Sequence, residues 1–221
     1  MSLVDVLIPA RDAAASVAKV VRGIPPRVAR SVIVIDGGSR DATARLAEDA
    51  GALVLRERDA GVGAACLRGL AHLSALPKPP DVVVFMAASG ADDPGDLPGL
   101  LRPLGENLFD LVIGSRALDP ERKLPATERA GRAVAVELIR AIYGHRYTDV
   151  GTFRAIRYPA LVALGLREPG AGIFVEMQIK ALKTGLRIAE TPVRAHPGPR
   201  RGTLVAAGQT LYQILRHATI R

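Results

Sequence analysis

Short apolar runs alternate with segments of helical periodicity through the first half of the chain. Strand-like runs rich in β-branched residues cover residues 4–8, 31–35, 53–56, 82–85 and 111–114. Between them, apolar residues recur at helical spacing over residues 13–22, 41–50, 64–76 and 96–104. Strands that alternate with helices are typical of βαβ units and a parallel sheet. The pattern therefore predicts an α/β fold.

The pattern changes in the second half of the chain. A helix is expected over residues 128–143, and strands over 153–156 and 187–193 enclose a further helix over 174–184. An amphipathic helix is expected over residues 203–218. There is no internal repeat and no low-complexity linker, and α/β folds of this length are often undivided. We expect residues 1–221 to form one domain.

Composition narrows the class of protein. The single cysteine, Cys66, excludes an intramolecular disulfide, and the four histidines are too scattered to suggest a zinc site. No apolar run approaches the ~20 residues that cross a bilayer. The first residues lack the charged and cleavable regions of a signal peptide. We expect a soluble cytoplasmic protein.

The charge of the chain favours anionic partners. Thirty Lys and Arg against 22 Asp and Glu give a formal net charge of +8. Such an excess suits nucleotide diphosphates, lipid phosphates, an acidic membrane face or nucleic acid, and it is equally typical of a solubilising surface. Aromatic residues make up only 4% of the chain, and no RNA-binding motif with stacking residues is present. We therefore do not expect nucleic acid as a partner.

Polar residues follow the first two predicted strands, where ligands bind in open α/β sheets. The sequence VLIPARDAA places Pro9, Ala10, Arg11 and Asp12 after the first strand, where they can cap a helix and meet a nucleotide base. Taken alone, this segment is better explained as an ordinary strand-to-helix turn. In VIVIDGGSRDAT, a buried strand ends at Asp36, whose carboxylate can accept hydrogen bonds from a base or ribose, and Gly37 permits close approach.

Further segments complete a family pattern. They are the Gly61-Val62-Gly63-Ala64 loop, DLVIGSR ending at Arg116, YTDVGTFRAI containing Asp149, and a closing stretch from Val175 through Glu190-Thr191-Pro192-Val193. Taken together and in this order, the segments resemble glycosyltransferase family 2, nearest to its polyprenyl- or dolichyl-phosphate sugar transferase subgroup. The resemblance implies a GT-A fold, a Rossmann-like single domain with a mostly parallel central sheet flanked by helices.

The resemblance also implies roles for particular residues. Residues 1–115 would form the nucleotide-binding half and residues 116–221 the acceptor half. Asp149 would lie beside the acceptor or sugar, and Arg116 would meet a phosphate, so both are catalytic candidates. The nucleotide-binding candidates are Pro9, Ala10, Arg11, Asp12, Asp36, Gly37, Gly61, Gly63, Ala64, Ala88 and Ser89. The acceptor-binding candidates are Arg129, Glu176 and Arg201.

One departure from the family concerns the metal. Where the family has an Asp-x-Asp that holds a divalent ion against the donor diphosphate, this chain has Ala87, Ala88 and Ser89. Mg²⁺ and Mn²⁺ need oxygen ligands, usually carboxylates. Asp92 and Asp93 follow, and we expect them to cap a helix near Pro94. A divalent metal is therefore compatible with the chain but is not expected to be essential.

The sequence leaves two functions open. The first is a transferase that moves a sugar from a nucleotide-sugar donor to a phosphate-bearing or hydroxyl acceptor. The second is a non-catalytic relative that binds a nucleotide, a sugar or a partner protein. The predicted last helix either packs on protein, which we favour, or rests on an anionic membrane, and a homodimer is compatible with either function.

Overall fold

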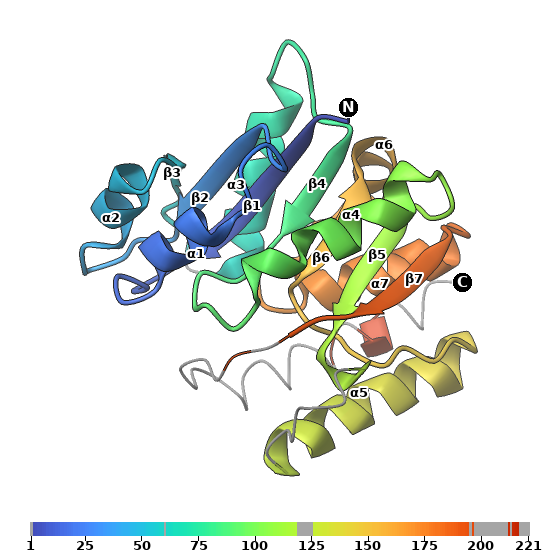
Figure 1. The fold of residues 1–221 in the computed structure, drawn as a ribbon. Helices are drawn as coiled ribbons and strands as arrows, with labels where there is room; N and C mark the ends of the chain where they lie inside the picture. The colour runs from blue at the N-terminus through green and yellow to red at the C-terminus, as the bar shows by residue number, and fades with distance from the viewer. Residues whose placement is uncertain are drawn as a thin grey trace.

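The fold is a seven-stranded mixed sheet with helices on both faces (Figure 1). A computed structural model describes residues 2–59, 61–118, 126–194, 196, 212 and 214–216, apart from the side chains of 126–132. The strands are β1 Val4–Ala10, β2 Ser31–Asp36, β3 Leu53–Arg56, β4 Val82–Phe85, β5 Leu111–Ser115, β6 Arg154–Arg157 and β7 Ile188–Pro192. The α-helices are α1 Val17–Gly23, α2 Thr43–Asp49, α3 Val62–Ser74, α4 Leu97–Gly105, α5 Ala126–Tyr143, α6 Tyr158–Ala163 and α7 Ile173–Lys183, with 3₁₀ turns η1 Pro94–Asp96 and η2 Arg116–Leu118.

The strands follow the order β3-β2-β1-β4-β6-β5-β7. Only β6 runs antiparallel, and it pairs with β4 on one side and β5 on the other. The other pairs are parallel, so the carboxyl ends of β1, β2, β4, β5 and β7 share one edge of the sheet with the amino end of β6. The predicted mostly parallel α/β architecture is confirmed.

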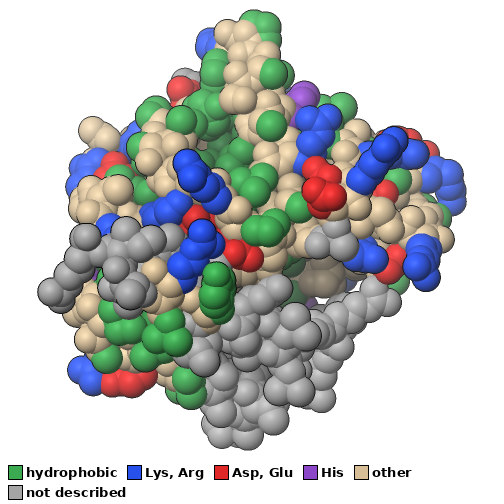
Figure 2. All heavy atoms as spheres, turned by 180° about the vertical axis from the view of Figure 1, so that it is seen from behind, with side chains coloured by type: hydrophobic (Ala, Val, Ile, Leu, Met, Phe, Trp, Pro, Cys, Tyr) green, Lys and Arg blue, Asp and Glu red, His purple; other side chains and the backbone are tan. Residues whose placement is uncertain are grey.

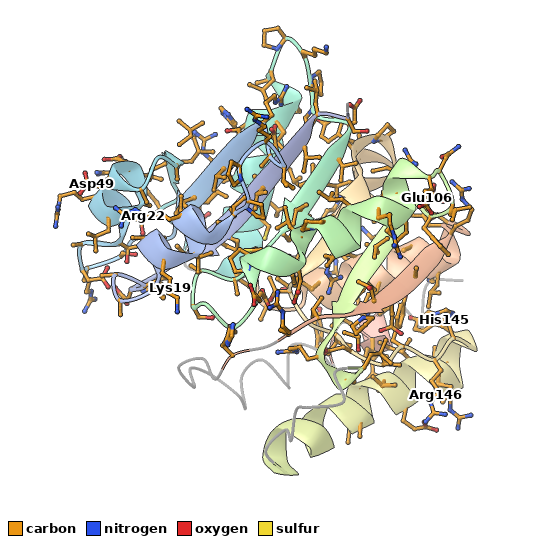
Figure 3. The ribbon with its side chains drawn as sticks, viewed as in Figure 1. Lys19, Arg22, Asp49, Glu106, His145 and Arg146 are labelled. Atoms are coloured by element: carbon orange, nitrogen blue, oxygen red, sulfur yellow. The ribbon has the colours of Figure 1, made fainter. Side chains whose placement is uncertain are left out.

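Two apolar layers cover the sheet. Val6 and Ile8 of β1 pack with α1, α2 and α4, whereas Leu7 packs on the opposite face with α3 and α7. Successive strand residues point to opposite faces, and both faces are covered, so a run such as β4 is buried at every position. The outer face of α1 is polar, and Lys19 and Arg22 project from it away from the sheet (Figure 3).

Most predicted elements lie within a few residues of the observed ones, with two differences. α1 begins at residue 17 rather than 13, because Asp12 takes a left-handed conformation (φ 49°) and residues 13–16 form a turn. α6, a helix of 6 residues, was not predicted. Of the predicted helix over 203–218, the structure describes only residues 212 and 214–216, which are helical. In the described part, no helix is long and apolar enough to cross a membrane.

A buried ion pair fixes the start of the first strand. Asp5 is fully buried in β1, and its carboxylate accepts a hydrogen bond of 2.9 Å from Nε of Arg30, which precedes β2. Nη1 of Arg30 also donates to the carbonyl oxygen of Lys78, 2.8 Å away. One guanidinium thus joins β1 to the segments that lead into β2 and β4.

Replacing Arg30 by Met should destabilise the fold, because it leaves the Asp5 carboxylate buried and uncompensated. Removing one partner of a buried pair costs about 3–5 kcal/mol, and the partial exposure of Arg30 places this case at the lower end of that range. Arg45→Met is the matched control, since the Arg45–Asp49 pair is exposed and worth less than about 1 kcal/mol. Urea unfolding measures both changes, and equal losses for the two variants would contradict this account.

Candidate active site

The carboxyl end of β2 forms a tight polar turn at the shared sheet edge. Asp36 closes β2 with 7% of its surface exposed, and its Oδ1 accepts hydrogen bonds from the backbone N–H and the hydroxyl of Ser39. The N–H of Gly37 donates to the carbonyl oxygen of Ala10, at the end of β1, over 2.8 Å. The turn that carries Asp36 is therefore held directly against the end of β1.

The segment after β1 is tied to the same turn. The N–H of Asp12 donates to the Ser39 hydroxyl over 2.9 Å, and the Asp12 carboxylate accepts from the N–H of Arg40, also over 2.9 Å. Pro9 and Ala10 are buried, whereas Arg11 is exposed. Four nucleotide-binding candidates, Pro9 to Asp12, thus lie beside two others, Asp36 and Gly37.

Asp41 serves the scaffold of this turn. Its carboxylate accepts from the N–H and hydroxyl of Thr43 and, over 3.1 Å, from the N–H of Ala14. The Thr43 hydroxyl hydrogen bond lowers the pKa of Asp41. This carboxylate therefore stays ionised as a local cap between the first two crossovers.

The turn after β4 carries the positions where the family has metal ligands. Ala87 is partly buried and Ala88 is buried, and the carbonyl oxygen of Ala88 accepts the Ser16 hydroxyl over 2.8 Å. Asp92 is buried beneath the turn, where its Oδ2 accepts the N–H of Ala87 over 2.9 Å. Burial raises the pKa of Asp92. Asp92 therefore braces the turn instead of capping a helix, whereas Asp93 caps η1 as predicted by accepting the N–H of Gly95.

A divalent ion does not fit the donor set of this turn. Ala87 and Ala88 have no side-chain oxygen, the Ser89 hydroxyl faces the N–H of Ala91 at 3.4 Å, and the Asp92 carboxylate is buried. Among the residues that the structure describes, no group of three His, Cys, Asp or Glu side chains is arranged to hold a metal ion. Hard cations need several oxygen ligands, which the side chains of residues 87–89 do not supply.

The segment after β7 is fastened to the same turn. The N–H of His196 donates to the carbonyl oxygen of Ala91 over 3.0 Å. The Arg194 guanidinium lies 2.9 Å from Oδ1 of Asp96 and 3.3 Å from Oδ2 of Asp93. These contacts bring the chain that leaves the last strand next to the turn after β4.

Arg116 and Asp149 form a buried clamp at the end of β5. Nε and Nη2 of Arg116 donate to the two oxygens of Asp149 over 2.8 and 3.0 Å, and the Arg116 N–H adds a third bond of 3.0 Å. Asp149 is fully buried, whereas the Arg116 side chain is 24% exposed. Burial opposes ionisation, but the Arg116 hydrogen bonds hold the pKa of Asp149 below its ordinary value. The pair presents a fixed guanidinium at the sheet edge.

Gly151 makes room for this guanidinium. A Cβ at position 151 would lie 3.1 Å from Nη2 and 3.4 Å from Cζ of Arg116. Bidentate Arg–carboxylate pairs add geometric specificity as well as energy. The two catalytic candidates are therefore brought together, with Arg116 facing outward and Asp149 behind it.

A second guanidinium lies wholly inside the protein. Arg154 of β6 is fully buried, and its guanidinium carbon Cζ lies 4.9 Å from the centroid of the Phe174 ring. Nη1 donates to the carbonyl oxygen of Phe174 over 2.9 Å and Nη2 to that of Gly151. Burial lowers the pKa of Arg154 to about 10, and the nearby Asp149 and Asp92 carboxylates oppose this change. Arg154 thus adds positive charge beneath the site without reaching solvent.

The glycine loop contacts protein backbone. A Cβ on Gly61 would overlap the carbonyl oxygen of Pro169, and one on Gly63 would overlap that of Glu168. The N–H of Ala64 donates to the carbonyl oxygen of Pro169 over 2.8 Å. Both glycines are therefore needed for close approach of the 168–170 segment, a role that a bare Gly-x-Gly does not reveal.

Glu176 supports that segment from behind. Its carboxylate accepts the N–H groups of Arg167 and Glu168 at 2.9–3.2 Å and lies 2.8 Å from Nζ of Lys180. Burial is offset by the Lys180 hydrogen bond, and the pKa of Glu176 is lowered. The other two acceptor-binding candidates, the side chain of Arg129 and the whole of Arg201, lie outside the part of the chain that the structure describes.

Glu190 is a site residue to which the sequence analysis gave no role. Its carboxylate accepts from the N–H and hydroxyl of Thr148 and from the N–H of Asp149 at 2.9–3.2 Å. Burial raises the pKa of Glu190, and the Thr148 hydrogen bonds oppose that effect. Its place in the closing stretch Glu190-Thr191-Pro192-Val193 was the only signal in the sequence. An acidic residue inside a strand is unusual enough to have been singled out.

A hollow among the described residues lies along α5. It has a volume of about 730 Å³ and is lined by Ala133, Val134, Val136, Glu137, Leu138, Ala141 and Arg146, all on α5 or just after it. Apolar side chains gather there at the lower left of Figure 2, while Lys and Arg are interspersed with Asp and Glu over the rest of that face. The hollow has no pair of facing carboxylates and no nucleophile, so its lining does not suggest chemistry.

Comparison with known proteins identifies the family of the chain. Residues 5–165 match the family described as Glycosyl transferase family 2. The chain is 30% identical over 199 residues to the glycosyltransferase AglJ of Haloferax volcanii, covering 89% of this chain and 64% of AglJ, which is less than two thirds of that protein. It is 32% identical over 174 residues to the undecaprenyl-phosphate mannosyltransferase of Micrococcus luteus, covering 73% of this chain and 70% of that enzyme.

Solved structures show the same fold. The glucosyl-3-phosphoglycerate synthase of Mycobacterium tuberculosis, in complex with phosphoglyceric acid, has a TM-score of 0.81 and 25% identity, covering all of this chain and 81% of that one. The same enzyme with UDP has a TM-score of 0.78 and 25% identity, with the same coverage. It has also been crystallised with Mn²⁺, UDP-glucose and phosphoglyceric acid (TM-score 0.79, 24% identity, covering 100% of this chain and 81% of that one).

Gly63→Ala should destabilise the protein although position 63 lies in a helix. Gly to Ala inside a helix normally stabilises by about 0.5–1 kcal/mol, but here the new Cβ overlaps the Glu168 carbonyl oxygen, and overpacking of this kind costs about 1–3 kcal/mol. The matched control is Gly99→Ala in α4, whose Cβ would meet nothing within 4 Å. Thermal unfolding should show a lower melting temperature for Gly63→Ala and a higher one for Gly99→Ala than for wild type. A stabilised Gly63→Ala would disprove the close contact.

Proposed function

Because the chain belongs to glycosyltransferase family 2, we propose that it transfers a sugar from a nucleotide-sugar donor to a phosphate-bearing or hydroxyl acceptor. The observation that carries this proposal is the arrangement of the sheet edge. Asp36 ends β2 and Arg116 follows β5 at the same edge, so an acceptor for base or ribose hydroxyls and a fixed cation for phosphate face one region. Ligands of open α/β sheets bind at such carboxyl ends.

The donor nucleotide is assigned to the ends of β1, β2 and β4. In this proposal it contacts Pro9 to Asp12, the Asp36–Gly37 turn and Ala88–Ser89. Support comes from the hydrogen bonds that hold the first two of these segments together, since a preorganised site loses less freedom on binding. Gly61, Gly63 and Ala64 serve this region through their packing on residues 168–170, and of the three Gly61 is partly buried whereas Gly63 and Ala64 are buried.

Arg116 is assigned to the phosphate chemistry. A fixed guanidinium stabilises the negative charge that develops on a leaving diphosphate, and such preorganised electrostatics make the largest contribution in many enzymes. Asp149 acts through Arg116, because both of its oxygens already accept hydrogen bonds. In this proposal Asp149 is a positioning residue behind a catalytic arginine.

A divalent metal is not essential in this proposal. The turn Ala87–Ser89 has no carboxylate, and the guanidinium of Arg116 lies at the same sheet edge. The solved Mn²⁺ complex belongs to a protein that is 24% identical and supports only the fold for this chain. Arg129, Glu176 and Arg201 remain assigned to the acceptor side, with Glu176 acting through the backbone of Arg167 and Glu168.

The turn Ala87–Ser89 favours a second candidate function, that of a non-catalytic relative that binds a nucleotide, a sugar or a partner protein. Loss of both carboxylates at positions 87 and 89 removes the means by which the family holds its metal. A fixed Arg116 guanidinium would bind a phosphate in either case. We favour the enzyme because the same guanidinium also stabilises the charge that develops on a leaving diphosphate.

Packing on protein is preferred to membrane contact for the last helix. Ile214 is fully buried, and its carbonyl oxygen accepts the hydroxyl of Tyr143 at 3.1 Å, which ties this turn to α5. Tyr212 and Leu215 are exposed beside it. These two exposed side chains would suit contact with a second copy of the chain, so a homodimer is part of the proposal. We also propose that the protein is cytoplasmic.

Asp36→Ala should weaken nucleotide binding at least tenfold. The change removes a charge-assisted hydrogen bond worth roughly 1.5–3 kcal/mol. Titration calorimetry with UDP and GDP measures the affinity, and Asp49→Ala on the exposed side of α2 serves as the control. If UDP or GDP binds wild type and Asp36→Ala with the same affinity, the nucleotide lies elsewhere.

Chelation should leave the activity nearly unchanged. The measurement is release of nucleoside diphosphate from UDP- and GDP-sugars with phosphoglycerate or polyprenyl phosphate, before and after dialysis against EDTA. Turnover within about twofold in both states supports the metal-independent enzyme. Turnover restored only by Mn²⁺ or Mg²⁺ contradicts it, and nucleotide binding without turnover of any pair favours the binding protein.

A further inference from the structure

A series of hydrogen bonds connects the Glu190 carboxylate to Arg116. Glu190 sits in β7 opposite Ile113 of β5, and its carboxylate reaches the segment that precedes β6. There it accepts the N–H of Thr148 at 2.9 Å, the Thr148 hydroxyl at 2.9 Å and the N–H of Asp149 at 3.2 Å. Glu190 is partly buried, and a carboxylate withdrawn from water needs such partners, because burying a charge without them is costly.

The hydrogen bonds of this series have a defined direction from donor to acceptor. The Ser115 and Thr148 hydroxyl oxygens are 2.6 Å apart, and the Ser115 oxygen also accepts the N–H of Ala117 at 3.2 Å. The groups that face the Glu190 carboxylate are two N–H donors and the Thr148 hydroxyl. An ionised carboxylate only accepts hydrogen bonds, so in that state the Thr148 hydroxyl proton points to Glu190. The Ser115 hydroxyl proton then points to Thr148. Ionised Glu190 thereby orients both hydroxyls and leaves the Ser115 oxygen as the acceptor for Ala117.

These hydrogen bonds hold Arg116 through its own side chain and backbone and through the next residue, Ala117. On one side, Asp149 accepts the Arg116 side chain and backbone N–H, and the N–H of Asp149 itself donates to Glu190. On the other side, the residue after Arg116 is anchored through Ser115 and Thr148 to the same carboxylate. Both of these hydrogen-bond routes connect Arg116 to the Glu190 carboxylate.

We propose that Glu190 is a positioning residue that fixes the orientation of the Arg116 guanidinium toward the phosphate of the substrate. The functional part of this inference rests on the proposed role of Arg116, whereas the positioning itself is a property of the fold. Without Glu190, the N–H groups of Thr148 and Asp149 lose their acceptor, and the Thr148 and Ser115 hydroxyls are free to turn. The 147–151 segment then holds Asp149, and through it Arg116, less firmly.

The positioning is tested by the NMR signal of the Arg116 Nε–H group, assigned by its absence in Arg116→Lys. In wild type, this proton should exchange slowly with solvent, because it is bonded to a fully buried carboxylate. Glu190→Ala should accelerate its exchange at least tenfold, and Glu190→Gln, which keeps one acceptor oxygen, should fall between. Asp110→Asn is the matched control, since Asp110 bonds Arg187 just before β7 at the opposite edge of the sheet.

An Arg116 Nε–H signal that is the same in wild type, Glu190→Ala and Glu190→Gln, each shown to be folded by circular dichroism, would overturn the inference. A change of the same size in Asp110→Asn would also overturn it, because the effect would then reflect general loosening of β7. The inference is thereby tested even where no substrate is known.

The functional consequence is tested with pyrophosphate as a probe of the anion site. Calorimetry should show a tenfold or larger loss of pyrophosphate affinity for Arg116→Gln, a smaller loss for Glu190→Ala, and no additional loss in the double variant, because Glu190 acts through Arg116. Additive losses would contradict that route. If Arg116→Gln binds pyrophosphate as wild type does, the proposed function of Arg116 fails, while the NMR result still decides the role of Glu190.

Discussion

The bidentate pair between Arg116 and Asp149 is the interaction on which the organisation of the site depends. It joins the end of β5 to the segment that enters β6, two parts of the chain separated by 33 positions. A buried carboxylate behind a partly exposed guanidinium is stable only where further donors satisfy it, and backbone N–H groups of Arg116 and Val150 do so. The geometry of the sheet edge at the end of β5 follows from that requirement.

The rest of the sheet edge is built by close contacts between turns. Ser39 links Asp36 to Asp12, Asp92 supports the turn after β4, and Gly61 and Gly63 allow the 168–170 segment to approach the start of α3. Arg154 adds a buried positive charge below these turns. Charge that a metal would contribute in relatives with Asp-x-Asp is, in this account, supplied by arginine held in a fixed orientation.

Much of the fold could be predicted from the sequence, because apolar runs such as Val82–Phe85 of β4 are typical of strands in a sheet that is covered on both faces. The ends of β1 and β2 were predicted for the same reason, with Asp36 at a strand tip. The contacts of Asp149 and Glu190 could not be predicted, since they join residues from β5, β7 and the segment before β6 whose proximity depends on strand order. The glycine loop shows the same limit, because its partner, Pro169, lies more than 100 residues away.

The central claim is that a nucleotide sugar binds at this edge with its phosphates directed to Arg116 and without metal ligands from residues 87–89. A crystal structure of the protein with a bound nucleotide sugar, grown with Mn²⁺ and recorded with anomalous scattering, tests it most directly. The account predicts the base or ribose at Asp36, a phosphate oxygen within hydrogen-bond distance of Arg116, and no anomalous peak coordinated by residues 87–92. A diphosphate held by Mn²⁺ on Asp92 or Asp93, or a nucleotide bound in the hollow along α5, would contradict it.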